Sequence, residues 1–303
     1  MQEFTQLLTD CLNQHGNCGT CLGGNCPNSF YCMGNNYPIG KCDGCLNHIQ
    51  WNLSPQFHYS CEKITYHYVL RFFNRFASEI AYAACTLNGA YLNGKQCLNV
   101  VSLGCGPGSE VYGFIYALRR KAPHIALNYQ GYDMNSIWAN VQQMSRNALA
   151  GTPHNIDFYS MNMFAAYPGF QGGGCDMLVL NYLLSDAQKY YTDAVKIQFL
   201  KEIAQFVYLN GIKNILFNDN AYYGTSGKLD SGVMMMCQLI RELKALKIQL
   251  NISWRFFPTI NYVTGGAWVP YKNYNLLFQS LAGNTFDKNV TCCKSRQIIV
   301  HIN

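Results

Sequence analysis

Short apolar runs alternate with amphipathic segments along most of the chain. The runs predict strands at 98–103, 125–132, 155–159, 177–181 and 214–218. Apolar residues at spacings of three and four predict a helix after the first run, and others near 190–210 and 232–246. Strands that alternate with helices favour a parallel sheet covered on both faces. Three later runs without helices between them predict antiparallel strands that finish the sheet, at 249–257, 276–281 and 296–302.

A further amphipathic helix is predicted ahead of the first strand, at residues 62–85. Val69, Phe73 and Phe76 lie on one face of it at helical spacing. We interpret this aromatic stripe as packing against the core, and His67 on the same helix as a partly buried structural histidine.

Cysteines divide the chain unevenly and predict two domains. Eight of the 15 cysteines lie in residues 1–61, among many Gly and Asn and few aliphatic residues. Such a segment needs a metal, an iron–sulfur cluster or disulfides to hold it together. We therefore expect a cysteine-rich module at 1–61, followed by an α/β domain at 62–303 with a Rossmann-like sheet.

The spacing of these cysteines favours zinc. Two Cys-x-x-Cys pairs, Cys18 with Cys21 and Cys42 with Cys45, match two knuckles that supply four thiolates to one tetrahedral zinc. A second, interleaved zinc site can be drawn from Cys26, Cys32, His58 and Cys61. A disulfide framework is the alternative, and an iron–sulfur cluster is a weaker one. We find neither a secretion signal nor an apolar run of about 18 residues, so a cytoplasmic setting without a membrane span is expected.

The stretch VVSLGCGPGSE, residues 100–110, carries the clearest chemistry. Its glycines follow the first predicted strand and precede a helix, where open α/β sheets bind ligands. The pattern is G-x-G-x-G, whereas a dinucleotide fingerprint is G-x-G-x-x-G. The second predicted strand ends at Asp133, an acid positioned to accept hydrogen bonds from a ribose diol.

In this order of glycine loop, helix, strand and acid, residues 62–303 resemble the class I S-adenosylmethionine (SAM) dependent methyltransferases. The resemblance implies SAM as cofactor and assigns its binding residues by position. The loop would hold the methionine and ribose, and Asp133 the ribose hydroxyls. Ser102 stands where many members carry an acid, so the cofactor amine would be bound by backbone carbonyls or Glu110. The implied cofactor residues are Gly104, Cys105, Gly106, Gly108, Glu110, Asp133, Met134, Asn162 and Met163, the last three around the adenine.

The acceptor of the methyl group is less well marked. Asn181 and Tyr182 end the fourth predicted strand and would lie beside the methyl group, but the two prolines typical of amine methylation are missing. Asp219, after the fifth strand, is the preferred base or anchor over Asp186. A net charge of +6 permits a polyanionic partner. We expect a macromolecular acceptor, RNA preferred. The alternatives are a protein or small-molecule methyltransferase, and a catalytically silent module that binds a partner.

Overall fold

A central sheet with helices on both faces organises the chain. The structure is a computed structural model that describes residues 1–17, 42–51, 59–87, 89–162, 174–220, 228–259 and 267–303. Within these residues the sheet has eight strands in the order β3-β2-β1-β4-β5-β8-β6-β7. Their bounds are β1 Cys97–Leu103, β2 Ala126–Asp133, β3 Asn155–Ser160, β4 Met177–Asn181, β5 Asn214–Asp219, β6 Leu250–Phe256, β7 Trp268–Pro270 and β8 Arg296–Ile302.

The sheet confirms the predicted class. Strands β1 to β5 pair in parallel, and β8 runs antiparallel to both of its neighbours, β5 and β6. The antiparallel strand is therefore internal, and the short strand β7 forms the edge by pairing in parallel with β6. The strand order reverses between β1 and β4, and such a switch point opens a crevice at the carboxyl ends of the strands.

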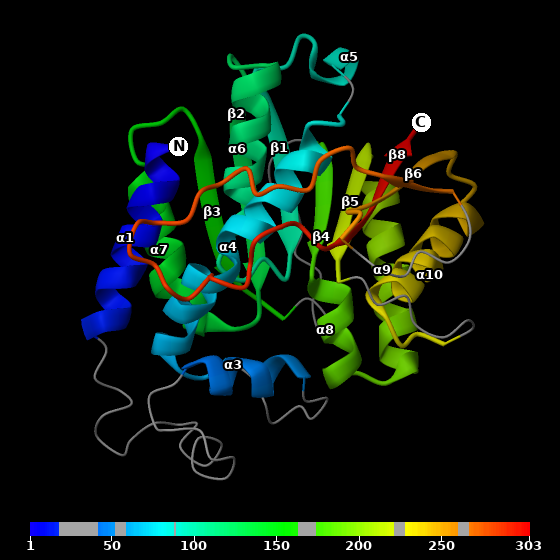
Figure 1. The fold of residues 1–303 in the computed structure, drawn as a ribbon. Coiled ribbons are helices and arrows are strands. Elements are labelled where there is room, and N and C mark those ends of the chain that lie inside the picture. Colours follow the sequence, from blue (N-terminus) through cyan, green and yellow to red (C-terminus); the bar gives the residue numbers. More distant parts are fainter. Residues whose placement is uncertain (18–41, 52–58, 88, 163–173, 221–227, 260–266) are drawn as a thin grey trace.

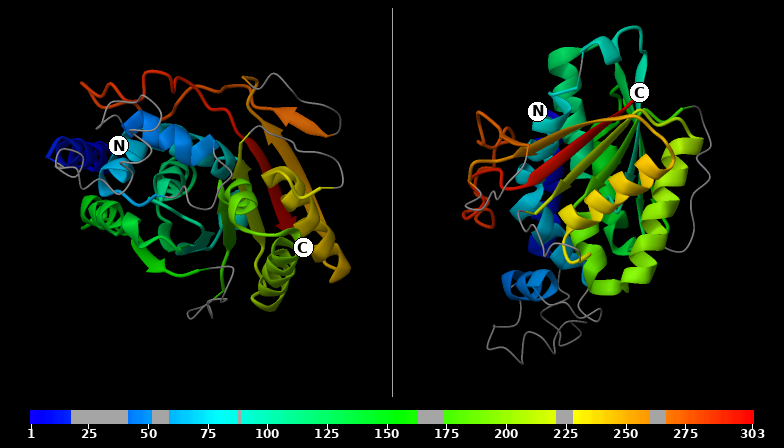
Figure 2. Two further views of the ribbon diagram at one scale, coloured as in Figure 1. Left: turned by 90° about the horizontal axis from the view of Figure 1, so that it is seen from below. Right: turned by 90° about the vertical axis from the view of Figure 1, so that its right-hand side faces the viewer.

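Two layers of helices cover the sheet, and Figure 2 shows them on opposite sides of it. Helices α1 (Gln2–Asn17), α4 (Glu62–Ala84), α6 (Ser109–Lys121) and α7 (Ala139–Leu149) share one apolar cluster. On the other face lie α8 (Leu183–Tyr190), α9 (Asp193–Leu209) and α10 (Gly232–Ala245). Adjacent strand residues face opposite layers, as Val100 and Val101 do, because side chains alternate along a strand.

Three short elements complete the described chain. Helix α3 (Cys42–Trp51) packs on α4, at the same end of the molecule as α8 (Figure 1). Helix α5 (Gly89–Leu92) precedes β1, and the 3-10 helix η2 (Ser136–Trp138) follows β2.

One predicted strand, at 276–281, is wrong. This segment contains no strand: the adjacent Asn275 forms a single bridge with Cys292, and Leu277 and Phe278 bind the Ser78 hydroxyl through their backbone N–H groups, at 2.8 and 3.3 Å. The apolar run covers the flank of α4 instead of joining the sheet. Periodicity alone does not separate these two uses of an apolar segment.

The first helix packs on the α/β core. Phe4 and Leu8 of α1 are buried with Phe73 of α4 and Tyr112 of α6 in one cluster. The ring of Phe4 also lies 4.6 Å from that of Phe278, centroid to centroid. The division after residue 61, between a cysteine-rich module and the α/β domain, stays a prediction. Helix α1 belongs to the first of these segments but packs on the core of the second.

Candidate functional site

The glycine loop leaves β1 in a conformation that side chains rarely adopt. Gly104, Gly106 and Gly108 have φ angles of 62°, 50° and 78°. A Cβ at Gly104 would lie 2.5 Å from a methyl carbon of Leu183, so the loop needs glycine there for both backbone and space. The backbone N–H of Cys105 donates to the Tyr132 carbonyl at 3.1 Å, which ties the loop to the end of β2.

Asp133 ends β2 and points its carboxylate at this loop. One oxygen accepts the Gly106 N–H and the other accepts the Asn135 N–H, both at 2.8 Å. Burial raises the pKa of Asp133 to about 6, although the two backbone donors oppose the shift. A carboxylate has about four acceptor positions, so two remain for a ligand. The glycine loop and Asp133 therefore lie in direct contact.

A pocket of about 450 Å³ opens between the carboxyl ends of β1, β2 and β4. Seven of the predicted site residues line it: Gly104, Cys105, Gly106, Asp133, Met134, Asn181 and Tyr182. The opposite wall is aromatic. The rings of Tyr59, Tyr68 and Trp138 lie 5.0–5.5 Å apart, and all three line the pocket. Tyr59 and Tyr68 precede β1 by some thirty residues or more, and no local motif marks them.

Charge in the pocket is acidic. Asp133 and Asp186 line it, and among the described lining residues there is no Lys, Arg or His. A pocket with carboxylates and aromatic faces suits a ligand that carries positive charge, because both attract cations.

Glu110 does not line the pocket. It is fully buried on α6, and its carboxylate accepts the hydroxyls of Ser102 and Tyr129. Burial raises its pKa, and these donors oppose the rise. The serine that stands in place of an acid at position 102 thus binds Glu110.

Asn181 and Tyr182 connect the pocket to a buried polar network. The Asn181 side-chain oxygen accepts from Asn218, which also donates to Glu79 at 3.2 Å. Tyr182 has a left-handed backbone (φ 56°), and its hydroxyl donates to Glu79 at 2.9 Å. Burial, together with Glu79, raises the pKa of the Tyr182 phenol. Glu79 lies on α4, fully buried, and the helical periodicity of that segment gives no sign of its role.

Asp219 lies behind the pocket. Its carboxylate accepts the backbone N–H of Ser185 at 2.9 Å and of Asn220 at 2.7 Å, so it holds the first turn of α8. Burial raises its pKa to about 7. Asp186, the alternative carboxylate, lines the pocket.

Two other predicted cofactor residues, Gly108 and Asn162, do not line the pocket, and a third lies outside the described residues. Gly108 does not line the pocket, and a Cβ there would lie 2.7 Å from the Phe158 ring. Asn162 follows β3 and forms a side-chain hydrogen bond with Tyr191, a pocket residue. Met163 lies outside the described residues.

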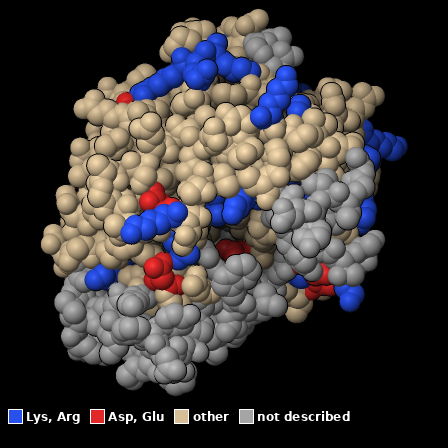
Figure 3. All heavy atoms as spheres, in the orientation of Figure 1, with Lys and Arg blue, Asp and Glu red and all other residues tan. Residues whose placement is uncertain are grey.

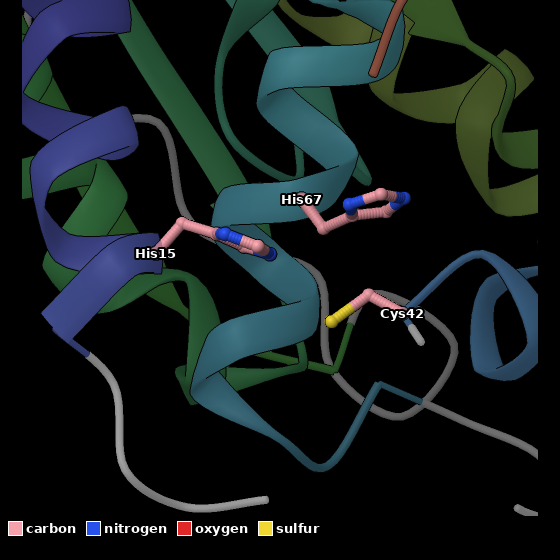
Figure 4. Close-up of side chains that lie close together, drawn as sticks. All are labelled: His15, Cys42 and His67. Carbon is pink, nitrogen blue, oxygen red and sulfur yellow. The ribbon is translucent and has the colours of Figure 1, made fainter. Parts of the chain in front are cut away.

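Only part of the predicted zinc sets lies in the described chain. Cys42 and Cys61 are buried and Cys45 is half-buried, whereas Cys18, Cys21, Cys26, Cys32 and His58 lie outside the described residues. Figure 4 shows Cys42 pointing toward His15 and His67, and the three ligand atoms lie within 4.8 Å of one another. Neither histidine was expected as a ligand. In the sequence, the position of His15 three residues before Cys18 is the one local indication that it could be a ligand.

Within the described residues, no helix is long and apolar enough to cross a membrane.

Comparisons with known proteins give remote similarities. No protein-family model matches the sequence. No curated protein matches it either. Among solved structures, the chain is similar to a putative class I SAM-dependent methyltransferase from Listeria monocytogenes, with 11% identity, a TM-score of 0.48, and coverage of 100% of this chain and 89% of that one. It is similar to the plantazolicin methyltransferase in complex with SAH (13% identity, TM-score 0.43, 86% and 94% covered). A third is the magnesium protoporphyrin IX methyltransferase from Synechocystis with bound SAM (11% identity, TM-score 0.41, 87% and 92% covered). At these identities and TM-scores, function has to be inferred from the pocket itself.

Proposed function

We propose that the chain is a SAM-dependent methyltransferase whose cofactor occupies the pocket at the glycine loop. The observation that carries the proposal is the combination of this loop, the oriented Asp133 carboxylate and an acidic, aromatic pocket without a basic side chain among its described lining residues. A dinucleotide would bring a pyrophosphate into this acidic pocket, whereas SAM brings a sulfonium and an ammonium.

The residues divide between binding and positioning. Asp133 would accept the ribose hydroxyls, and Trp138 with Tyr68 would cover the cofactor and exclude water. When bound, SAM supplies an activated methyl group. The chain has then to align an acceptor with it and remove any proton that the acceptor carries.

Asn181, Tyr182 and Asp186 are the groups available for that task, since all three line the pocket. We assign Asp219 a positioning role, because its oxygens bind the backbone at the start of α8, the helix that carries Asp186. The Glu79 network would fix the Tyr182 ring, which packs 4.4 Å from that of Phe76.

We extend the proposal to RNA as the acceptor and zinc as a bound metal. The net charge of +6 supports RNA. Figure 3 shows Lys and Arg in several separate groups on one face, and acidic side chains lie beside those near its centre. The cysteine spacing and the His15, Cys42, His67 cluster support zinc.

Transfer of a radiolabelled methyl group from SAM into a fractionated cell extract, followed by digestion of the labelled product with RNase, DNase or protease, tests the proposal. Label removed by RNase supports RNA as acceptor, and label that resists both nucleases but not protease moves the acceptor to protein. Label that resists all three enzymes moves it to a small molecule. No transfer and no SAM binding in calorimetry would favour the silent binding module and refute the enzyme.

A further inference from the structure

Three helices that are distant in sequence each bring one metal-ligand side chain to the same point. His15 is near the end of α1, Cys42 begins α3 and His67 lies in the first half of α4. Cys42 and His67 are buried and His15 is half-buried. Ligands of a tetrahedral zinc lie roughly 3.3–3.8 Å apart. The present spacing within 4.8 Å therefore needs a contraction of about 1.5 Å at most.

Both imidazoles leave one nitrogen without a hydrogen-bond partner among the described residues. These atoms are His15 Nε2 and His67 Nδ1, and both are buried. A buried nitrogen without a partner costs roughly 1–3 kcal/mol. The two rings lie 5.6 Å apart, centroid to centroid, so that one metal ion between them could bind both.

Asp43 fixes the orientation of His67. Its Oδ1 lies 2.9 Å from His67 Nε2 and also accepts from Arg71. A carboxylate only accepts, so Nε2 carries the proton and the lone pair of His67 is on Nδ1. A histidine that donates to a carboxylate through one nitrogen and keeps the other free is the usual arrangement of a metal ligand.

Phe286, from the segment that covers α4, shields the site. Its ring lies 4.8 Å from that of His15 and 4.9 Å from that of His67. An apolar cover excludes water and strengthens the bonds of a metal to its ligands.

We propose that His15, Cys42 and His67 bind one zinc ion, with Asp43 as the residue that positions His67. Two imidazoles and a thiolate suit zinc, which takes nitrogen and sulfur ligands. This set differs from the four-thiolate site drawn from the Cys-x-x-Cys pairs, because it uses Cys42 with histidines. The ion would join α1, α3 and α4, and its existence does not depend on the methyltransferase proposal.

Zinc-edge X-ray absorption together with elemental analysis tests this site on the full chain purified without chelator. We expect zinc with imidazole scattering and sulfur among its direct ligands, and the same measurement shows whether the fourth ligand is sulfur or a nitrogen or oxygen atom. His15→Ala and His67→Ala should each lower the zinc content by up to one equivalent and weaken the imidazole signal. His124→Ala, an exposed histidine outside the cluster, is the matched control.

Asp43→Asn keeps the proposal testable if His67→Ala does not fold, because the Asp43 side chain is 60% exposed. It should weaken zinc binding about 10- to 100-fold in a competition with a chelator of known affinity. Protein without zinc, an all-sulfur first shell, or unchanged zinc in both folded histidine variants would overturn the proposal.

Discussion

Replacement of Asp133 by alanine tests the cofactor site most directly. The side chain would accept two hydroxyls of a ribose while its other acceptor positions hold Gly106 N–H and Asn135 N–H. Hydrogen bonds to a charged group contribute roughly 1.5–3 kcal/mol each. Loss of two at the lower value costs about 3 kcal/mol, which is roughly a 150-fold rise in the dissociation constant of SAM.

Isothermal titration of SAM and SAH into Asp133→Ala and the unmodified chain measures this change. Asp157→Ala, a carboxylate on β3 that does not line the pocket, is the control. The pKa of Asp133 near 6 adds a second expectation. Because the ionised form accepts both hydroxyls, affinity should fall as the pH drops through about 6 in the unmodified chain and stay flat in the variant. A dissociation constant within threefold of the unmodified value would refute the role of Asp133.

Three further predictions concern the groups around the pocket. Asp219 holds a proton in the native state up to about pH 7, whereas the unfolded chain releases it near 3.8, so its stabilising contribution is lost as the pH rises. Between pH 5 and 7 the free energy of unfolding should fall by about 2 kcal/mol more in the unmodified chain than in Asp219→Asn, measured with urea. Tyr182→Phe removes the hydrogen bond to Glu79 and should lower the rate of methyl transfer, with stability reduced by about 1 kcal/mol and SAM affinity unchanged in calorimetry. Gly104→Ala should cost roughly 2–4 kcal/mol in urea unfolding through backbone strain and a clash with a leucine, whereas Gly94→Ala, with similar φ but open space, should cost about 1–2 kcal/mol.

Residues of the candidate site that lie at the ends of neighbouring strands could be predicted from the sequence. The glycines after β1 and the acid after β2 are local signals, and parallel strands bring their carboxyl ends together. The same reasoning placed Asn181 and Tyr182 at the pocket. These residues could be predicted because secondary structure and strand order alone fix their positions.

Residues that reach the site from helices could not be predicted in this way. The aromatic stripe on α4 was expected to pack, yet its Phe76 and the neighbouring Tyr68 line the pocket. Glu79 of the same helix forms a polar network with residues outside that helix, Tyr182 and Asn218. Asp219 lies at the end of β5, close to where the sequence predicts a strand end, but its carboxylate binds the backbone of α8 and does not line the pocket. His15 and His67 meet Cys42 only because three helices pack together, and apart from the position of His15 three residues before Cys18, spacing along the chain does not indicate this cluster.

The packing of α1 also bears on how the chain folds as it is synthesised. Phe4 receives an aromatic partner at Phe278, and His15 receives another at Phe286. Helix α1 is synthesised before both phenylalanines, so it acquires these partners only after more than 260 further residues have followed. Phe73 and Tyr112 can cover part of Phe4 earlier, but the side of its ring that faces Phe278 stays accessible to chaperones or to other nascent chains until Phe278 has been synthesised.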